Sequence, residues 1–180
     1  YIFLDTDERR RFAQVSHEYL IEQVQFSNTV TLDEGSNEFE LRFNHPCKEL
    51  IWSIQKNGQT GFNYFNGTTA TSKDILRSSL LQLNGHDRFS VRDGTYFRLV
   101  QPYQYHTGGN LQDPTKELGG YYVYSFGLKP EEHQPSGTCN FSRIDNAVLL
   151  TDSHSKGVMR VYATNYNVLR IMSGMGGLAY

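Results

Sequence analysis

Apolar and polar residues alternate with a period of two along most of the chain. The clearest run is 38–43, where Phe39, Leu41 and Phe43 alternate with charged residues. Successive side chains of a strand point to opposite faces, so this pattern predicts half-buried β-strands. Eight such runs occur, at residues 18–26, 38–43, 49–55, 75–83, 120–126, 143–150, 158–164 and 168–172.

Two segments show a helical pattern instead. Asp5 and Glu8 have the spacing of a capping box, which predicts one or two helical turns before His17. In the second segment, 93–101, Phe97 and Val100 share one helical face, and Pro102 is expected to end the turn.

Turn and loop residues separate the runs. Asn-Gly pairs, which tolerate positive φ, occur at 57–58, 66–67 and 84–85. All five prolines are expected in connecting segments, where no ladder hydrogen bond is lost: Pro46, Pro102, Pro114, Pro130 and Pro135.

These patterns together predict an all-β chain, an eight-stranded antiparallel jelly-roll sandwich. With the runs lettered B to I in chain order, short helices lie in the N-terminal segment and in the E–F connection. At 180 residues and 20.7 kDa the chain has the size of one domain, so residues 1–180 are expected to form a single jelly roll.

Composition excludes several classes of protein. Hydrophobic residues make 38% and there are 16 glycines, a globular composition rather than a disordered or collagen-like one. No apolar run is long enough for a membrane helix, and direct membrane insertion is not expected. The chain starts at Tyr1, without Met or a secretory pattern, so a piece of a longer polypeptide is expected.

Charge gives no sign of a nucleic-acid partner. The net charge is −2, and the basic triplet Arg9–Arg11 follows Asp5, Asp7 and Glu8, which largely cancel its field. The two cysteines, Cys47 and Cys139, suit free buried thiols in a reducing compartment, although a single bridge between them stays open.

No pattern indicates catalysis, a metal or a cofactor. The six histidines are isolated and no His-x-His pair exists, which disfavours a cupin-type metal site; His86-Asp87 alone is a weak signal. Phosphate-binding loops and nucleophile elbows are absent. Arg143 and Asp145 are two apart on a predicted strand, so a structural ion pair is expected there. We therefore expect no enzyme.

Two sequons are candidate glycosylation sites. Asn66-Gly-Thr lies in the D–E loop, 57–73, where it could be exposed. Asn140-Phe-Ser precedes the 143–150 run, where a glycan would be harder to place.

Several segments, in order along nearly the whole chain, resemble the major capsid protein of nucleocytoplasmic large DNA viruses. The most specific is Pro135-Ser-Gly-Thr-Cys-Asn-Phe-Ser-Arg-Ile-Asp-Asn146. The others are Leu4–Phe12, His17–Val24, Leu83–Phe89, Tyr96-Phe97, Gln101–Tyr103, Tyr124–Glu131 and Tyr162–Ala179.

This resemblance implies a structural role without catalytic residues. Family members carry two consecutive jelly rolls, and three subunits make a pseudo-hexagonal capsomer of an icosahedral shell. The chain resembles the second, C-terminal jelly roll. The implied partners are copies of itself, the sister N-terminal jelly roll and minor capsid proteins. The implied location is the virion, after assembly in the host cytoplasm.

Loop geometry adds one expectation within that family. The D–E segment 57–73 and the F–G segment 129–139 should lie together at the outward end, with Asn66 as the glycan candidate. The helix around Phe97 should lie at the opposite, inward end.

Two other functions remain as alternatives. A jelly-roll carbohydrate-binding module would stack sugars on exposed aromatic residues such as Tyr64 and Phe65. A cupin-like enzyme would need a bound transition metal.

Overall fold

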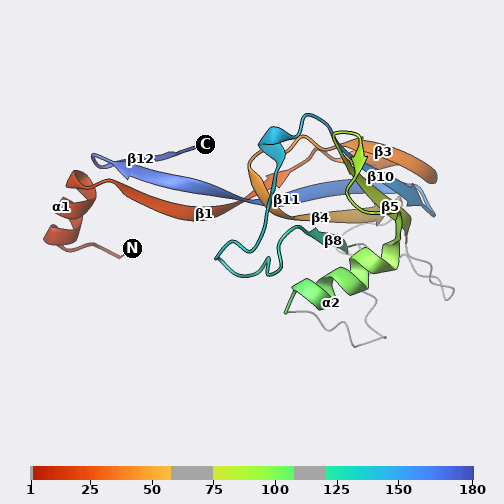
Figure 1. The fold of residues 1–180 in the computed structure, drawn as a ribbon, viewed down its shortest axis with the longest axis horizontal. Helices are drawn as coiled ribbons and strands as arrows, with labels where there is room; N and C mark the ends of the chain where they lie inside the picture. Colours follow the sequence, from red (N-terminus) through yellow and green to blue (C-terminus); the bar gives the residue numbers. More distant parts are fainter. Residues whose placement is uncertain (1, 58–74, 108–120) are drawn as a thin grey trace.

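The computed structural model describes residues 2–57, 75–107 and 121–180. Within these ranges two antiparallel β-sheets pack face to face, and one end of the larger sheet extends well beyond the sandwich (Figure 1). No helix of the described ranges is long and apolar enough to cross a membrane.

The elements follow one another along the chain with short strands interspersed among longer ones. Their order is α1 (Thr6–Gln14), β1 (His17–Phe26), β2 (Val30–Leu32), β3 (Gly35–Glu40), β4 (Pro46–Lys56), β5 (Leu76–Leu83), β6 (His86–Asp87), β7 (Arg92–Asp93), η1 (Tyr96–Val100), α2 (Gln101–Tyr105), β8 (Tyr121–Ser125), β9 (Cys139–Asn140), η2 (Phe141–Arg143), β10 (Ala147–Ser153), β11 (Gly157–Met172) and β12 (Met175–Leu178).

Each sheet has a central row of four strands. The larger has the order β1-β11-β4-β8, with β2 and β12 also paired to β11 and β9 paired to β4. The smaller has the order β3-β10-β5-β6, with β7 also paired to β5. The chain passes repeatedly between the two sheets and every pairing is antiparallel, which confirms the predicted jelly-roll sandwich.

The core lies between the two sheets and is rich in aromatic side chains. Trp52 of β4 is 1% exposed and packs against Phe97, with ring centroids 5.1 Å apart, and against Tyr122 of β8. Leu81 and Leu149 supply the facing layer from the smaller sheet. Alternation in β4 places Leu50, Trp52 and Ile54 on this buried face, as predicted.

The predicted N-terminal capping box is confirmed. The Asp5 side chain accepts a hydrogen bond from the Thr6 backbone N–H at 2.7 Å, and Glu8 accepts one from the Asp5 N–H. The Asn84-Gly85 turn is also confirmed: both residues have positive φ, 51° and 78°, and they join β5 to β6.

Two predicted strands have different bounds in the structure. The run 38–43 is strand only through Glu40, although Leu41 and Phe43 still point into the core. The run 143–150 becomes strand only at Ala147, because Asn140 caps a 3₁₀ turn over 141–143. Arg143 and Asp145 are therefore not neighbours on one strand face, so the predicted basis for their ion pair is wrong.

The runs 158–164 and 168–172 were expected as two strands, but they form the single strand β11 of 16 residues. Strand β1 pairs with β11 continuously across Asn165–Asn167, so the chain does not turn between the two runs. Beyond β11, Ser173 and Gly174 turn at positive φ, 52° and 75°, and lead into β12.

Two prolines lie inside elements rather than in connectors. Pro46 is the first residue of β4, a position where the missing N–H does not break the ladder. Pro102 does not end the helix, which continues to Tyr105. The preceding residues 96–100 form a wider π-turn, in which Gln101 N–H bonds to the Tyr96 carbonyl, and Pro102 occupies the first turn of α2.

The helical segment lies between β5 and β8, as expected, but β6 and β7 come before it and extend the smaller sheet. Strand β8 is therefore the sixth of the eight main strands, G, rather than the fifth, F. Segment 129–139 leads into β9, which pairs with the start of β4 at Pro46 and Cys47. Residues 58–73 of the other segment, 57–73, lie outside the described residues, so the expectation that both segments gather at one end stays a prediction.

Candidate assembly surface

A β-bulge in β4 turns two adjacent charged residues toward the same face of the larger sheet. Glu49 pairs with Thr164 of β11, but Asn165 pairs with Cys47, so Lys48 has no partner in this ladder. An extra residue of this kind locally breaks the alternation of side chains. Lys48 and Glu49 both reach groups on the outer face of the sheet, and both are buried.

Lys48 is paired with β1 across this face. Its Nζ lies 2.7 Å from Glu22 Oε1 and 5.5 Å from the centre of the Tyr166 ring, and its side chain is only 5% exposed. A buried ammonium group is costly unless it is paired, so this arrangement fixes β4 relative to β1 and β11. The same Glu22 oxygen lies 3.9 Å from His133 Nδ1.

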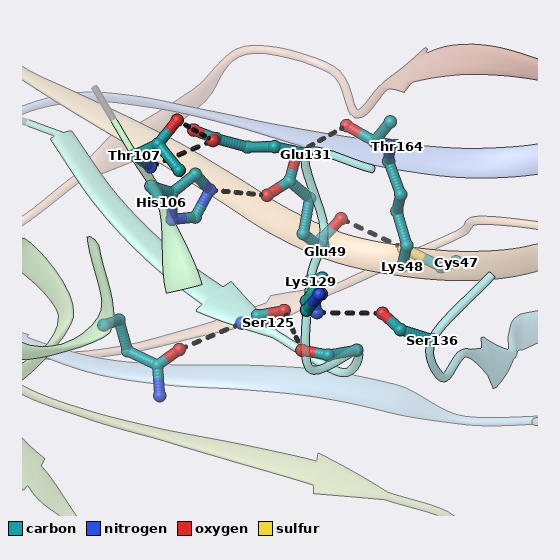
Figure 2. A network of polar contacts seen from close by, with 12 residues as sticks. Cys47, Lys48, Glu49, His106, Thr107, Ser125, Lys129, Glu131, Ser136 and Thr164 are labelled. Carbon is teal, nitrogen blue, oxygen red and sulfur yellow. Dashed lines mark hydrogen bonds and ion pairs between the residues drawn. The ribbon is translucent and has the colours of Figure 1, made fainter. Parts of the chain in front are cut away.

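Glu49 holds the end of α2 against the sheet. Its Oε2 lies 2.9 Å from His106 Nε2, and its Oε1 accepts a hydrogen bond from the Thr164 hydroxyl (Figure 2). This contact raises the pKa of His106 above its ordinary value, because the hydrogen bond to Glu49 favours the charged imidazolium. Both side chains are largely buried, at 16% and 11% exposure.

Next to this pair, a second contact holds the residue that follows His106. Thr107 donates hydrogen bonds to the Glu131 carboxylate from its backbone N–H, at 2.9 Å, and from its hydroxyl (Figure 2). The charged groups of this cluster therefore bind one another and hold the helical segment and the segment after β8 onto the sheet. We call Lys48 and Glu49, together with the side chains that they bind, the clamp, because they hold neighbouring segments in place.

An arm that projects from the sandwich is highly exposed. It consists of α1, the first half of β1, the second half of β11, and β12, and it extends away from the sandwich (Figure 1). Helix α1 has no buried residue, and all four residues of β12 are exposed. Helix α1 touches β11, and the ring of Phe12 packs on His17 at 4.7 Å.

The arm exposes large apolar side chains. Met175 is 74% exposed, Leu178 53% and Tyr180 80%, while Ile2 and Phe3 are almost fully exposed. Exposed apolar side chains on a segment that projects from the sandwich are candidates for burial against another protein. We therefore take the arm as the candidate assembly surface.

A hollow of about 450 Å³ lies where the arm meets the sandwich. It is lined from β11 by Tyr166 and Val168, from the segment before β4 by His45, from η2 by Arg143, and by the last residue, Tyr180. Pro46 at the start of β4 and Tyr180 just after β12 both line the hollow, so it borders the arm.

The structure describes only some of the candidate site residues from the sequence. Asn66, Tyr64 and Phe65 lie outside the described residues. The Asn140 side chain accepts a hydrogen bond from Ser142 N–H, and the Ser142 hydroxyl accepts one from His45 N–H. Within residues 2–57, 75–107 and 121–180, no three His, Cys, Asp or Glu side chains gather as metal ligands.

Sequence reasoning missed both the clamp and the arm. Lys48 and Glu49 immediately precede a run of alternating apolar residues, and two adjacent charges there were the only signal of the clamp. The sequence pattern does not indicate the arm, because it divides β11 into the separate runs 158–164 and 168–172.

Comparisons with known proteins agree with this geometry. The family of large eukaryotic DNA virus major capsid proteins matches residues 8–177. The chain is 52% identical to the major capsid protein of Pyramimonas orientalis virus and 42% identical to that of Phaeocystis pouchetii virus, in each case over all of this chain. It covers 47% and 52% of those relatives, so it spans about half their length.

Among solved structures, a quasi-atomic structure of the PBCV-1 virus capsid superposes on the whole chain with a TM-score of 0.82 at 39% identity. The match covers 55% of that capsid chain. The resemblance found in the sequence is thereby confirmed, and the chain belongs to the family of major capsid proteins of large eukaryotic DNA viruses.

Proposed function

We propose that residues 1–180 are the second, C-terminal jelly roll of a major capsid protein. Three copies of the complete protein form a pseudo-hexagonal capsomer, and capsomers form an icosahedral shell. The proposal is supported by the structural match of a virus capsid protein to the whole of this chain, and by the exposed apolar residues of the arm.

The proposed function works by burial and shape rather than by chemistry. A stable interface between subunits buries at least about 1,200 Å² in total, and a closed symmetric shell repeats one set of contacts many times. Within the described residues the buried charges Lys48 and Glu49 bind groups of the same chain. No catalytic group, cofactor or metal is needed for this role.

The partners follow from the same proposal. They are further copies of the protein, the sister N-terminal jelly roll in the half that this chain does not span, and minor capsid proteins. The protein is a component of the virion and assembles in the host cytoplasm. The proposal includes neither a nucleic-acid contact nor membrane insertion.

The only role that we propose for carbohydrate is as an N-linked glycan on the protein. We propose Asn66 as the glycan-bearing sequon, and Asn140 as the weaker candidate because its side chain and that of Ser142 are both engaged in hydrogen bonds. Mass spectrometry of tryptic peptides from virions tests this. A glycan on Asn66 and an unmodified Asn140 are expected, and the reverse would contradict it. None of the relatives described above is a carbohydrate-binding module.

Electron microscopy of the complete polypeptide tests the proposed function. After expression and purification, the protein is expected to form particles of pseudo-hexagonal outline. Well-folded protein that stays as single small particles at every concentration would contradict the proposal.

A further inference from the structure

The two cysteines lie directly opposite each other on neighbouring strands. In the pairing of β4 with β9, Cys47 is the register partner of Cys139. Directly opposed residues of an antiparallel pair project to the same side of the sheet, so the two thiols share one face. Both are free in this structure.

The backbone geometry is compatible with a disulfide. The Phe141 N–H bonds to the His45 carbonyl at 3.1 Å, which makes His45 and Phe141 a hydrogen-bonded pair. Cys47 and Cys139 are two positions further along the same ladder, so they also occupy a hydrogen-bonded pair, with Cα atoms about 5.5 Å apart. That value lies in the usual range for disulfides, about 4.4–6.8 Å.

The remaining adjustment is small and falls on a weakly held strand. Opposed Cβ atoms are about 4.5–5.5 Å apart in a ladder but about 3.5–4.5 Å apart in a disulfide. Closure therefore draws the strands together by about 1 Å. Strand β9 has only two residues and, among the described residues, pairs only with β4, so it can make this movement without disturbing the main sheets.

The two thiols differ in access and reactivity. Cys47 has no exposed surface, and its Sγ donates a hydrogen bond to the Glu49 carbonyl at 3.1 Å. Burial raises the pKa of Cys47 to about 12. Cys139 is half-buried, and although burial raises its pKa too, the nearby positive charge of Arg88 acts in the opposite direction.

We propose that Cys47 and Cys139 form a latent disulfide site, in which Cys139 reacts first with an external disulfide and Cys47 then closes the bridge. This proposal does not depend on the proposed capsid function. With oxidised glutathione, the Cys139 thiolate attacks one sulfur and releases one glutathione thiolate, leaving a mixed disulfide on Cys139. The Cys47 thiolate then attacks the Cys139 sulfur and expels the second glutathione.

The balance of this reaction is complete. Two protein thiols are oxidised to one disulfide, one glutathione disulfide is reduced to two glutathiones, and the two protein protons pass to them. In a reducing compartment the two cysteines stay as thiols, and in an oxidising compartment they form the disulfide. The bridge would tie the segment after β8 covalently to β4, next to the clamp formed by Lys48 and Glu49.

Two single variants test the order of the steps. The purified, unassembled full-length protein is incubated with oxidised glutathione, and its cysteine peptides are followed by mass spectrometry. The wild type is expected to lose two hydrogen atoms and to give a linked Cys47–Cys139 peptide. Cys47→Ser is expected to accumulate one glutathione on Cys139, whereas Cys139→Ser stays unmodified at Cys47.

A stable mixed disulfide on the wild type without closure would overturn the proposal. So would modification of Cys47 in folded Cys139→Ser at the rate seen for Cys139 in Cys47→Ser. Circular dichroism verifies that each variant is folded. If a variant fails to fold, the wild type alone still tests the proposal. Disulfide formation under native conditions should then raise its melting temperature by several degrees. Disulfide formation only in denaturant would refute the proposal.

Discussion

Single residues in this protein are placed by their neighbours across strands as much as by their own alternation. The sequence predicts correctly that Leu50, Trp52 and Ile54 face the core. It does not predict where Lys48 points, because the bulge that turns this residue depends on the register with β11, which is distant in the chain. A local pattern contains no information on such a register.

The contact between His106 and Glu49 makes stability depend on pH. Substitution His106→Ala is expected to cost about 3 kcal/mol, because it leaves the Glu49 carboxylate largely buried without this partner. The pKa of His106 in the folded state lies above its ordinary value of 6.5, owing to the hydrogen bond with Glu49. Its stabilising effect is thus complete below pH 6.5 and lost as pH rises through the folded-state pKa.

Denaturant unfolding of both proteins at mildly acidic and mildly alkaline pH measures this effect. The difference between wild type and variant should be larger at the acidic pH. His86→Ala, at an exposed position in β6, serves as the control and should change stability little. An equal loss at both pH values would contradict the assigned role of His106.

At the scale of elements, the helical segment is fixed to the sandwich at both of its ends. Phe97 packs against Trp52 at one end, and His106 binds Glu49 at the other. Between them, the Gln101 side-chain oxygen accepts a hydrogen bond from the Ser125 N–H of β8. The sequence predicts the presence of this helix from Phe97 and Val100. It misplaces the helix end because the π-turn before Pro102 depends on tertiary packing.

Gly94 makes the closest backbone approach at the start of this segment. A Cβ built there would lie 2.1 Å from the Leu76 carbonyl oxygen of β5, a backbone atom that cannot move aside cheaply. Gly94→Ala is therefore expected to lose about 1–3 kcal/mol of unfolding free energy. Gly177→Ala in β12 is the matched control, since nothing lies within 4 Å of its Cβ position. Thermal unfolding of both variants compares them, and equal melting temperatures would count against this packing.

At the scale of the whole molecule, the fold class and the long strands are predictable from the sequence, and the short strands are not. Alternation identifies the long strands, but β6 and β7 have two residues each and leave no periodic pattern. Because the sequence pattern misses them, it assigns β8 to a position one strand too early in the jelly roll. Likewise, the arm appears only when the two last runs are seen as the single strand β11.

The arm gives a direct prediction about assembly. Met175→Asp and Leu178→Asp place charges on exposed apolar positions, so the isolated fold should keep its melting temperature. Burial of an unpaired carboxylate in an interface is costly, and capsomer formation should be reduced at least about tenfold. Leu128→Asp, at a position 72% exposed and outside the arm, is the control. Sedimentation velocity of the full-length variants measures the loss, and assembly equal to that of the control would rule out the arm as an interface.

The proposed function requires that copies of this protein pack against one another. The most direct test is the mass of the purified full-length protein in solution, measured by light scattering after size-exclusion chromatography. We expect a mass of three subunits that persists on dilution to low concentration. A folded protein with the mass of one subunit throughout the same range would contradict it.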